Sequence, residues 1–174
     1  MKKLSIIVPC YNEQETVELF IREMEKVETE MPLKFEYIFI NDGSSDETLR
    51  VLKNAASLKE NINFISFSRN FGKEAALIAG LKAATGDFVT VMDVDLQDPP
   101  ALLGQMLAGI EAGGVDCVAT RRVTRKGEPR VRSYFARMFY RIINRISKTE
   151  VVDGARDFRL MTRQMVDAIL SLRE

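Results

Sequence analysis

Short apolar runs alternate with helical patterns along most of this chain, and this alternation limits the fold more than any other feature. The runs are rich in β-branched and aromatic residues, and each is about as long as one buried strand. The five runs that predict strands are Leu4–Val8, Glu36–Ile40, Ile62–Phe67, Phe88–Met92 and Val115–Ala119. Between them, apolar residues at three- and four-residue steps predict helices over 17–31, 45–59, 72–84 and 99–113. This order predicts an α/β fold with a mostly parallel sheet and helices on both faces.

Composition limits the chemistry that the chain can perform. Its 174 residues, 46% of them apolar, are enough for one domain with a sizeable core. The absence of histidine excludes His-based triads and His-containing zinc sites, and two cysteines alone cannot close a zinc site. Cys10 and Cys117 lie in or beside strand-like runs, which predicts buried free thiols in a reducing compartment. Any reaction must therefore use carboxylates, basic side chains, backbone amides or a hard metal ion.

Charge is distributed unevenly along the chain. Residues 121–148 contain ten of the 25 basic residues but only one of the 25 acidic residues, Glu128. An acidic body with one basic segment predicts a local anionic partner and argues against a nucleic-acid-binding protein. The first residues do not resemble a signal peptide, and no apolar run reaches the ~20 residues of a transmembrane helix. The last residue, Glu174, lies inside a helical pattern, so we expect the domain to continue beyond it.

Two carboxylates, Asp93 and Asp95, follow the fourth predicted strand. In open α/β sheets, ligands bind outside the carboxyl ends of the strands. Two carboxylates at this place repel each other, and the loss of their hydration costs further free energy unless a cation binds them. A hard divalent ion shared with a diphosphate would relieve both costs. For Asp98 a structural role is favoured, because an aspartate before Pro99 predicts an N-cap with proline at the first helical position.

The turns after the first two strands allow a structural and a functional interpretation. In the structural one, Asn12 and Ser44 cap the helices that follow. In the functional one, Tyr11 packs on a nucleotide base, Glu13 accepts from a ribose or base edge, and Asp42 accepts an N–H of the base. Capping leaves Asp42 unexplained, since it stands at a strand end before a glycine.

Taken together, these turns resemble those of family 2 glycosyltransferases. The segments that carry the resemblance, in the family's order, are Leu4–Glu13, Ile40–Asp46, Ser68–Ala76 and Asp93–Pro100. They are most similar to the polyprenyl-phosphate branch, such as bactoprenol glucosyltransferases and dolichol-phosphate mannosyltransferases. The resemblance implies the Rossmann-like GT-A fold, a nucleotide-diphosphate sugar donor, Mg²⁺ or Mn²⁺ as cofactor, and inversion at the anomeric carbon. No Gly-x-Gly-x-x-Gly follows the first strand, which argues against a dinucleotide-dependent dehydrogenase.

The resemblance also implies roles for individual residues. Asp93 and Asp95 would bind the metal ion, and Asp95 and Asp157 would be the catalytic carboxylates. The residues that would contact the donor are Pro9, Tyr11, Glu13, Asp42, Arg69, Lys73, Asp93, Asp95 and Gln97, with Asn70 and Gly72 beside them. Without the resemblance, residues 69–73 would be interpreted as a loop and a helix start with a solvated lysine.

Residues 154–160 resemble the family's Gly-Asp-Phe-Arg-Leu motif, whose aspartate lies at the acceptor side. Here Arg156 stands where glycine is usual, which adds positive charge beside Asp157. A polyprenyl phosphate acceptor is already anionic at neutral pH, because the second pKa of a phosphate monoester is about 6. Asp157 would then orient the acceptor, whereas a sugar hydroxyl acceptor would require Asp157 as a general base.

Residues 130–147 predict an amphipathic helix with arginines beside an apolar stripe. Two interpretations stay open: a core-packing helix with a solvated basic face, and a helix on a membrane surface, where each basic residue near anionic lipid contributes ~1 kcal/mol. The resemblance favours the membrane surface, because the family places its lipid-phosphate acceptor here. Arg121, Arg130 and Arg132 are the candidates for binding that phosphate, since guanidinium groups match phosphate oxygens.

We therefore expect a single catalytic domain over 1–174, with a nucleotide-sugar half in 1–120 and an acceptor-side segment in 121–174. It would transfer a hexose from a UDP-sugar to a polyprenyl phosphate, in the cytoplasm at the inner face of the cell membrane. Two alternatives stay open: a polysaccharide-synthesising transferase that acts on a sugar hydroxyl, and a non-catalytic sugar-nucleotide-binding module. The sequence leaves open the base, the sugar, the acceptor and whether the chain forms a homo-oligomer.

Overall fold

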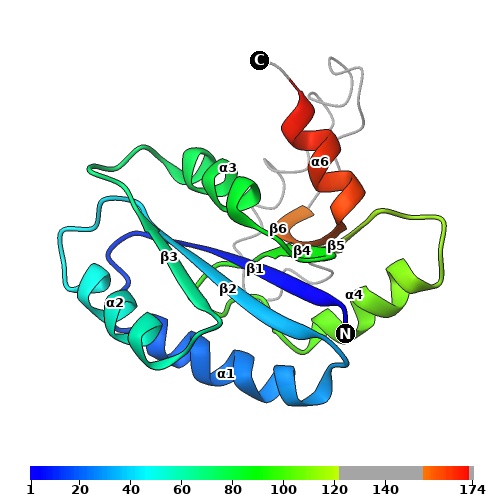
Figure 1. Ribbon diagram of the computed structural model, residues 1–174, viewed down its shortest axis with the longest axis horizontal. Coiled ribbons are helices and arrows are strands. Elements are labelled where there is room, and N and C mark those ends of the chain that lie inside the picture. The colour runs from blue at the N-terminus through cyan, green and yellow to red at the C-terminus, as the bar shows by residue number, and fades with distance from the viewer. Residues whose placement is uncertain (122–154, 173–174) are drawn as a thin grey trace, which may run out of the picture. The chain divides into compact units, whose positions relative to one another are not determined.

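The computed structural model of the chain describes residues 1–121 and 155–172 (Figure 1). Strands and helices alternate along these ranges. In chain order they are β1 (Lys3–Cys10), α1 (Val17–Glu30), β2 (Lys34–Asn41), α2 (Thr48–Leu58), β3 (Ile62–Ser66), α3 (Lys73–Ala83), β4 (Phe88–Val91), α4 (Leu102–Glu111), β5 (Cys117–Arg121), β6 (Ala155–Thr162) and α6 (Arg163–Ser171). The predicted strands are confirmed to within a few residues, and the amphipathic helix predicted over 130–147 lies outside the described residues.

The chain divides into two compact units, one formed by residues 1–118 and 157–174 and the other by 119–156. The six strands form one sheet in the order β3-β2-β1-β4-β6-β5. β1 pairs in parallel with β2 and β4, and β2 pairs in parallel with β3. β6 is antiparallel to β4, with Val91 opposite Arg159. The predicted α/β fold with a mostly parallel sheet is thus confirmed.

In the larger unit, helices cover both faces of the sheet (Figure 1). Neighbouring side chains of a strand point to opposite faces, and β1 shows this directly. Ile6 packs in a buried cluster that includes residues of α1, α2 and α4, whereas Ile7 packs in a second cluster with residues of α3 and α6. Both isoleucines are fully buried. Burial of each such side chain contributes about 1.5–3 kcal/mol, so the continuous apolar character of β1 is explained by its two covered faces.

Close packing fixes α3 against the sheet. A methyl group on Gly80 would approach Cγ2 of Ile7 to 2.3 Å, so only glycine allows the helix to lie this near to β1. The N-terminus of α3 therefore has a defined position relative to the end of β1. None of the helices in the described ranges is long and apolar enough to cross a lipid bilayer.

The predicted helix caps are wrong. α1 follows Thr16 and not Asn12, α2 follows Glu47 and not Ser44, and α4 follows Ala101 and not Asp98. For Asn12 and Ser44 the physical reason is visible, because their side chains form hydrogen bonds between two loops and are not available to a helix terminus.

Candidate active site

The loops after β1 and β2 are joined by reciprocal hydrogen bonds at the carboxyl end of the sheet. The backbone N–H of Asn12 donates to Oγ of Ser44 (3.0 Å), and Oδ1 of Asn12 accepts from the backbone N–H of Ser45 (2.9 Å). Glu13 donates its backbone N–H to Oγ1 of Thr48 (2.8 Å). Asn12 has a positive φ of 56°, a conformation that asparagine adopts more readily than most residues and that these hydrogen bonds hold in place. Tertiary contacts therefore determine the shape of both loops.

Asp42 connects the end of β2 to the loop that precedes α3. Its carboxylate is buried and accepts from the backbone N–H groups of Phe71 (2.7 Å) and Gly72 (3.0 Å). The next residue, Gly43, has a φ of 66°, and a methyl group there would lie 2.2 Å from the carbonyl carbon of Arg69. The aspartate at this strand end thus has a structural task that the sequence did not reveal. Its predicted contact with a nucleotide base stays a prediction.

One ammonium group joins two carboxylates at the N-terminus of α3. Nζ of Lys73 lies 2.7 Å from Oδ1 of Asp93 and 2.9 Å from Oδ2 of Asp157. Asp93 follows β4 and Asp157 lies in β6, so the antiparallel pairing of these strands brings the two acids to one place. The side chains of the three residues are between 38% and 54% exposed, so this cluster is open to solvent.

The ion pairs shift the pKa values of Lys73 and Asp157 in opposite directions. Partial burial lowers the pKa of Lys73, but the hydrogen bonds to Asp157 and Asp93 outweigh burial, so the pKa lies above its ordinary value. The hydrogen bond from Lys73 lowers the pKa of Asp157, and the nearby charges of Lys73 and Arg159 act in the same direction. Both groups are therefore charged at neutral pH.

The second carboxylate after β4 has a different environment. Asp95 is exposed, and Gln97 folds back on it: the backbone N–H of Gln97 donates to Oδ1 (3.2 Å) and its Nε2 donates to Oδ2 (2.7 Å). Leu96, between them, has a positive φ of 57°. Among the described residues, the two non-glycine residues with positive φ are Asn12 and Leu96, and each lies in a loop that follows a strand at the carboxyl end.

A cleft of about 380 Å³ opens at this end of the sheet, within the size range of small-molecule sites. The residues that line it are Pro9, Cys10, Tyr11, Glu13, Asp42, Asn70, Gly72, Lys73, Ala76 and Asp93. Most of the predicted donor contacts therefore share one cavity. Asp95, Gln97 and Arg69 are not among the lining residues, and the guanidinium of Arg69 lies 4.1 Å from the ring centre of Phe71. Burial raises the pKa of the Cys10 thiol, so this side chain is neutral.

Of the three arginines predicted at the acceptor side, the described residues include only Arg121. Arg121 is exposed at the end of β5, in the smaller of the two units. Arg130 and Arg132 lie outside the described residues. Their assignment to an acceptor phosphate stays a prediction.

The carboxylates fit a divalent cation that is shared with a substrate. No group of three or more His, Cys, Asp or Glu side chains is arranged as metal ligands among the described residues, so this part of the chain offers at most a pair of carboxylates. Mg²⁺ keeps several waters and is commonly bound through one or two carboxylates plus substrate phosphates. Asp93 already attracts a cation, the ammonium of Lys73. The donor set is therefore suited to a hard ion held jointly with a diphosphate.

Comparison with known proteins agrees with this geometry. Residues 5–170 match the family described as "Glycosyl transferase family 2". The chain belongs to this family. It is 44% identical to "Putative glycosyltransferase CsbB" of Bacillus subtilis (strain 168), over 98% of this chain and 51% of the relative. It is 39% identical to "Bactoprenol glucosyl transferase" of Shigella phage SfX, over 99% of this chain and 56% of that protein. The chain thus spans about half the length of these relatives.

A comparison with solved structures shows the same fold. The structure of "Mannosyltransferase PcManGT from Pyrobaculum calidifontis in complex with GDP-Man and Mn2+" superposes with a TM-score of 0.66 at 20% identity, over 97% of this chain and 46% of that one. The predicted GT-A fold is confirmed.

The bridge that Lys73 forms between Asp93 and Asp157 was not predicted from the sequence, because the lysine was assigned to the nucleotide side. A lysine at the first turn of a helix that follows a strand end was the available signal.

Proposed function

We propose that this chain is the catalytic part of an inverting, metal-dependent hexosyltransferase that uses a nucleotide-diphosphate sugar, with uridine as the base, and a polyprenyl phosphate as acceptor. The observation that carries the proposal is the meeting of Asp93 and Asp157 at Lys73, beside the cleft that contains Asp42 and Tyr11. A donor-side and an acceptor-side carboxylate are thereby next to each other, as a direct displacement requires.

The donor occupies the cleft in this proposal. Tyr11, half exposed, presents an aromatic face to the base, and Glu13 faces the same cavity as a hydrogen-bond acceptor. Asp42 contributes mainly by fixing the loop that carries Asn70 and Gly72, which also line the cleft. The interlocked loops hold these groups in place before the donor binds, and such preorganisation reduces the entropic cost of binding.

Asp93 and Asp95 hold Mg²⁺ or Mn²⁺ in this proposal. When bound, such an ion neutralises the charge that develops on the leaving diphosphate and orients it. Gln97 keeps the Asp95 carboxylate oriented through two hydrogen bonds. The presence of Mn²⁺ in the mannosyltransferase complex named above supports a divalent ion in this fold, without specifying the metal here.

The hydrogen bonding and lowered pKa of Asp157 favour a lipid-phosphate acceptor over a sugar hydroxyl. Its hydrogen bond from Lys73 keeps it ionised and lowers its basicity, which makes it a weak general base. A phosphate monoester needs no deprotonation at neutral pH, so an orienting role for Asp157 is sufficient. The bactoprenol glucosyl transferase of phage SfX, by its name, supports the same acceptor class. The enzyme would then work at the inner face of the cell membrane, with Arg121, Arg130 and Arg132 near the acceptor phosphate.

The decisive experiment measures donor binding and transfer separately. Calorimetric titration with UDP and with GDP, each with and without Mn²⁺, should show tighter binding of UDP and a further gain with metal. Transfer of radiolabelled hexose to polyprenyl phosphate in vesicles should exceed transfer to soluble saccharides. Preference for GDP would move the donor toward GDP-mannose. Binding of the nucleotide without any transfer would instead support a non-catalytic sugar-nucleotide-binding module.

A further inference from the structure

We infer that Lys73 is the resident cation of this site: its ammonium neutralises Asp93 and Asp157 together, and a divalent cation must compete with it for Asp93. The inference rests on the proposed function, because it assigns Asp93 to the metal. It makes Lys73 a positioning residue that sets the affinity for the metal ion, a role different from the donor contact expected from the sequence.

The backbone holds Lys73 firmly at this place. Lys73 is the first residue of α3, and the preceding residue, Gly72, donates its N–H to the buried carboxylate of Asp42 (3.0 Å). Further along the helix, Gly80 packs against Ile7 of β1 with no room for a methyl group. The start of the helix is thus tied to β2 and its body to β1. The ammonium is presented by a rigid element, with only the lysine side chain free to rearrange.

Charge explains why a cation is needed there. Two ionised carboxylates near each other raise each other's energy unless an opposite charge compensates both. Lys73 provides this compensation through two contacts of 2.7 and 2.9 Å, one to each carboxylate. An ammonium has three N–H donors, so these contacts still leave one donor for an anionic ligand.

Lys73 and the proposed metal ion bind the same carboxylate, that of Asp93. Oδ1 of Asp93 contacts Lys73, and Asp93 is the proposed metal ligand. Ion binding at Asp93 must therefore overcome repulsion from the ammonium, and an ion that binds Oδ1 must also break the Lys73–Asp93 pair. Lys73 keeps its contact with Asp157 when the ion is bound, so the acceptor-side carboxylate stays paired and in position. Metal binding on the donor side and the position of Asp157 on the acceptor side are thereby linked through one lysine.

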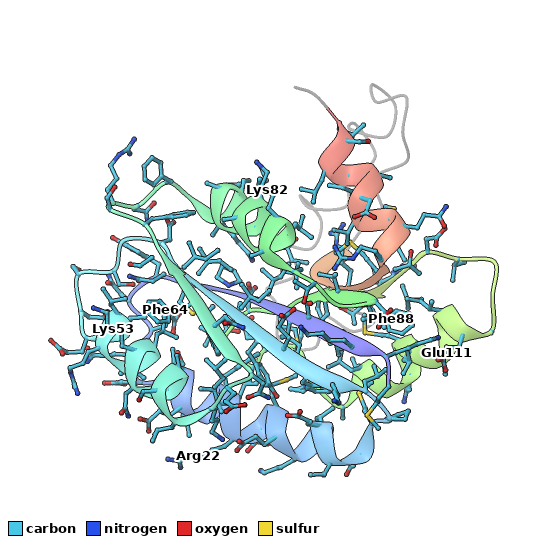
Figure 2. All side chains as sticks on the ribbon, in the orientation of Figure 1. Arg22, Lys53, Phe64, Lys82, Phe88 and Glu111 are labelled. Carbon is cyan, nitrogen blue, oxygen red and sulfur yellow. The ribbon has the colours of Figure 1, made fainter. Side chains whose placement is uncertain are left out.

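The test is a titration with Mn²⁺ alone, followed by electron paramagnetic resonance of the free ion at constant neutral pH, on the 174-residue chain without nucleotide. Lys73→Met should bind Mn²⁺ about three- to tenfold more tightly than the wild type, a modest factor because the pairs are partly exposed. Lys73→Arg keeps the positive charge and should stay within about twofold of the wild type. Lys82→Met is the matched control, since Lys82 lies exposed in the last turn of the same helix (Figure 2).

The outcomes separate the two proposals. Tighter binding by Lys73→Met alone supports the inference, and circular dichroism confirms that all variants are folded. Equal or weaker binding by Lys73→Met, with binding reduced in Asp93→Asn, overturns the role of Lys73 and leaves the metal site intact. Binding that is unchanged in Asp93→Asn, or undetectable in every variant even after UDP is added, overturns the metal assignment itself, and the inference with it.

Discussion

At the amino end of the sheet a lysine pairs with one buried carboxylate, and at the carboxyl end a lysine pairs with two exposed ones. At the amino end, the side chain of Glu36 is 10% exposed and accepts from Nζ of Lys3 (2.7 Å), Oγ of Ser5 (2.5 Å) and the backbone N–H of Thr85 (3.1 Å). At the carboxyl end, Lys73 serves two carboxylates that are 43% and 54% exposed. The first network is closed by the protein itself, whereas the second remains accessible.

This difference separates a charged group that serves stability from charged groups that remain available to a ligand. Burial raises the pKa of Glu36, but the hydrogen bonds from Lys3, Ser5 and Thr85 outweigh it, so the pKa lies below its ordinary value of 4.5. A carboxylate whose acceptor sites are all used by the fold has little capacity left for a ligand. The open pair at the carboxyl end keeps that capacity. Substitutions that remove a carboxylate should therefore affect different properties at the two ends, activity at the carboxyl end and stability at the amino end.

The largest effect is expected from Asp93→Asn. Loss of the proposed metal ligand should reduce hexose transfer about 100- to 1,000-fold, because the leaving diphosphate is no longer stabilised. The side chain is 43% exposed, so the free energy of unfolding should change little. Steady-state kinetics and urea unfolding test both parts. Full activity of Asp93→Asn would show that this carboxylate is not required for transfer.

Gly43→Ala should damage the carboxyl end through packing. The new methyl group would meet the backbone of Arg69 at 2.2 Å, at a φ of 66° that disfavours alanine. We expect a loss of about 2–4 kcal/mol in the free energy of unfolding, together with weaker nucleotide binding. Gly104→Ala is the control, since nothing lies within 4 Å of the added methyl group in α4. Equal stability of the two variants in urea would show that the loop can shift at no cost.

Glu36→Gln should reduce stability without reducing transfer. Replacing the carboxylate weakens several charge-assisted hydrogen bonds and leaves Lys3 without its countercharge, for an expected cost of about 1–3 kcal/mol at pH 7. A group whose pKa is lowered by folding contributes stability above its ordinary pKa and loses it as pH falls through the folded value. The cost should therefore shrink below about pH 4. A penalty that is the same in urea unfolding at pH 7 and pH 3 would contradict this assignment.

The smallest effect is expected from Asp157→Asn with a lipid-phosphate acceptor. If Asp157 only orients the acceptor, transfer should fall by less than about tenfold, which corresponds to about 1.4 kcal/mol. With a sugar hydroxyl as acceptor the same change should cost about 100- to 10,000-fold, because a general base is lost. Parallel assays with both acceptors measure the contrast. A large and equal loss would show that Asp157 acts as a base toward either acceptor.

The sequence alone determined the fold class, the family and the segments that form the cleft. Strand and helix periodicity is local, so the positions of β1 to β4 could be predicted to within a few residues. Parallel strands bring their carboxyl ends to one edge, and this places Tyr11, Asp42 and Asp93 at one cleft without knowledge of the sheet order. The roles of the individual site residues remain predictions.

The tertiary structure decided what those residues contact. Asp42 binds backbone N–H groups 29 and 30 positions away, and Lys73 meets Asp157 84 positions away. Asn12 and Ser44 bond to each other's loops and cap no helix. Such pairings depend on strand order, on the antiparallel entry of β6 beside β4 and on the approach of α3 to β1. Periodicity in the sequence contains none of this information, because each of these pairings joins segments that are distant along the chain.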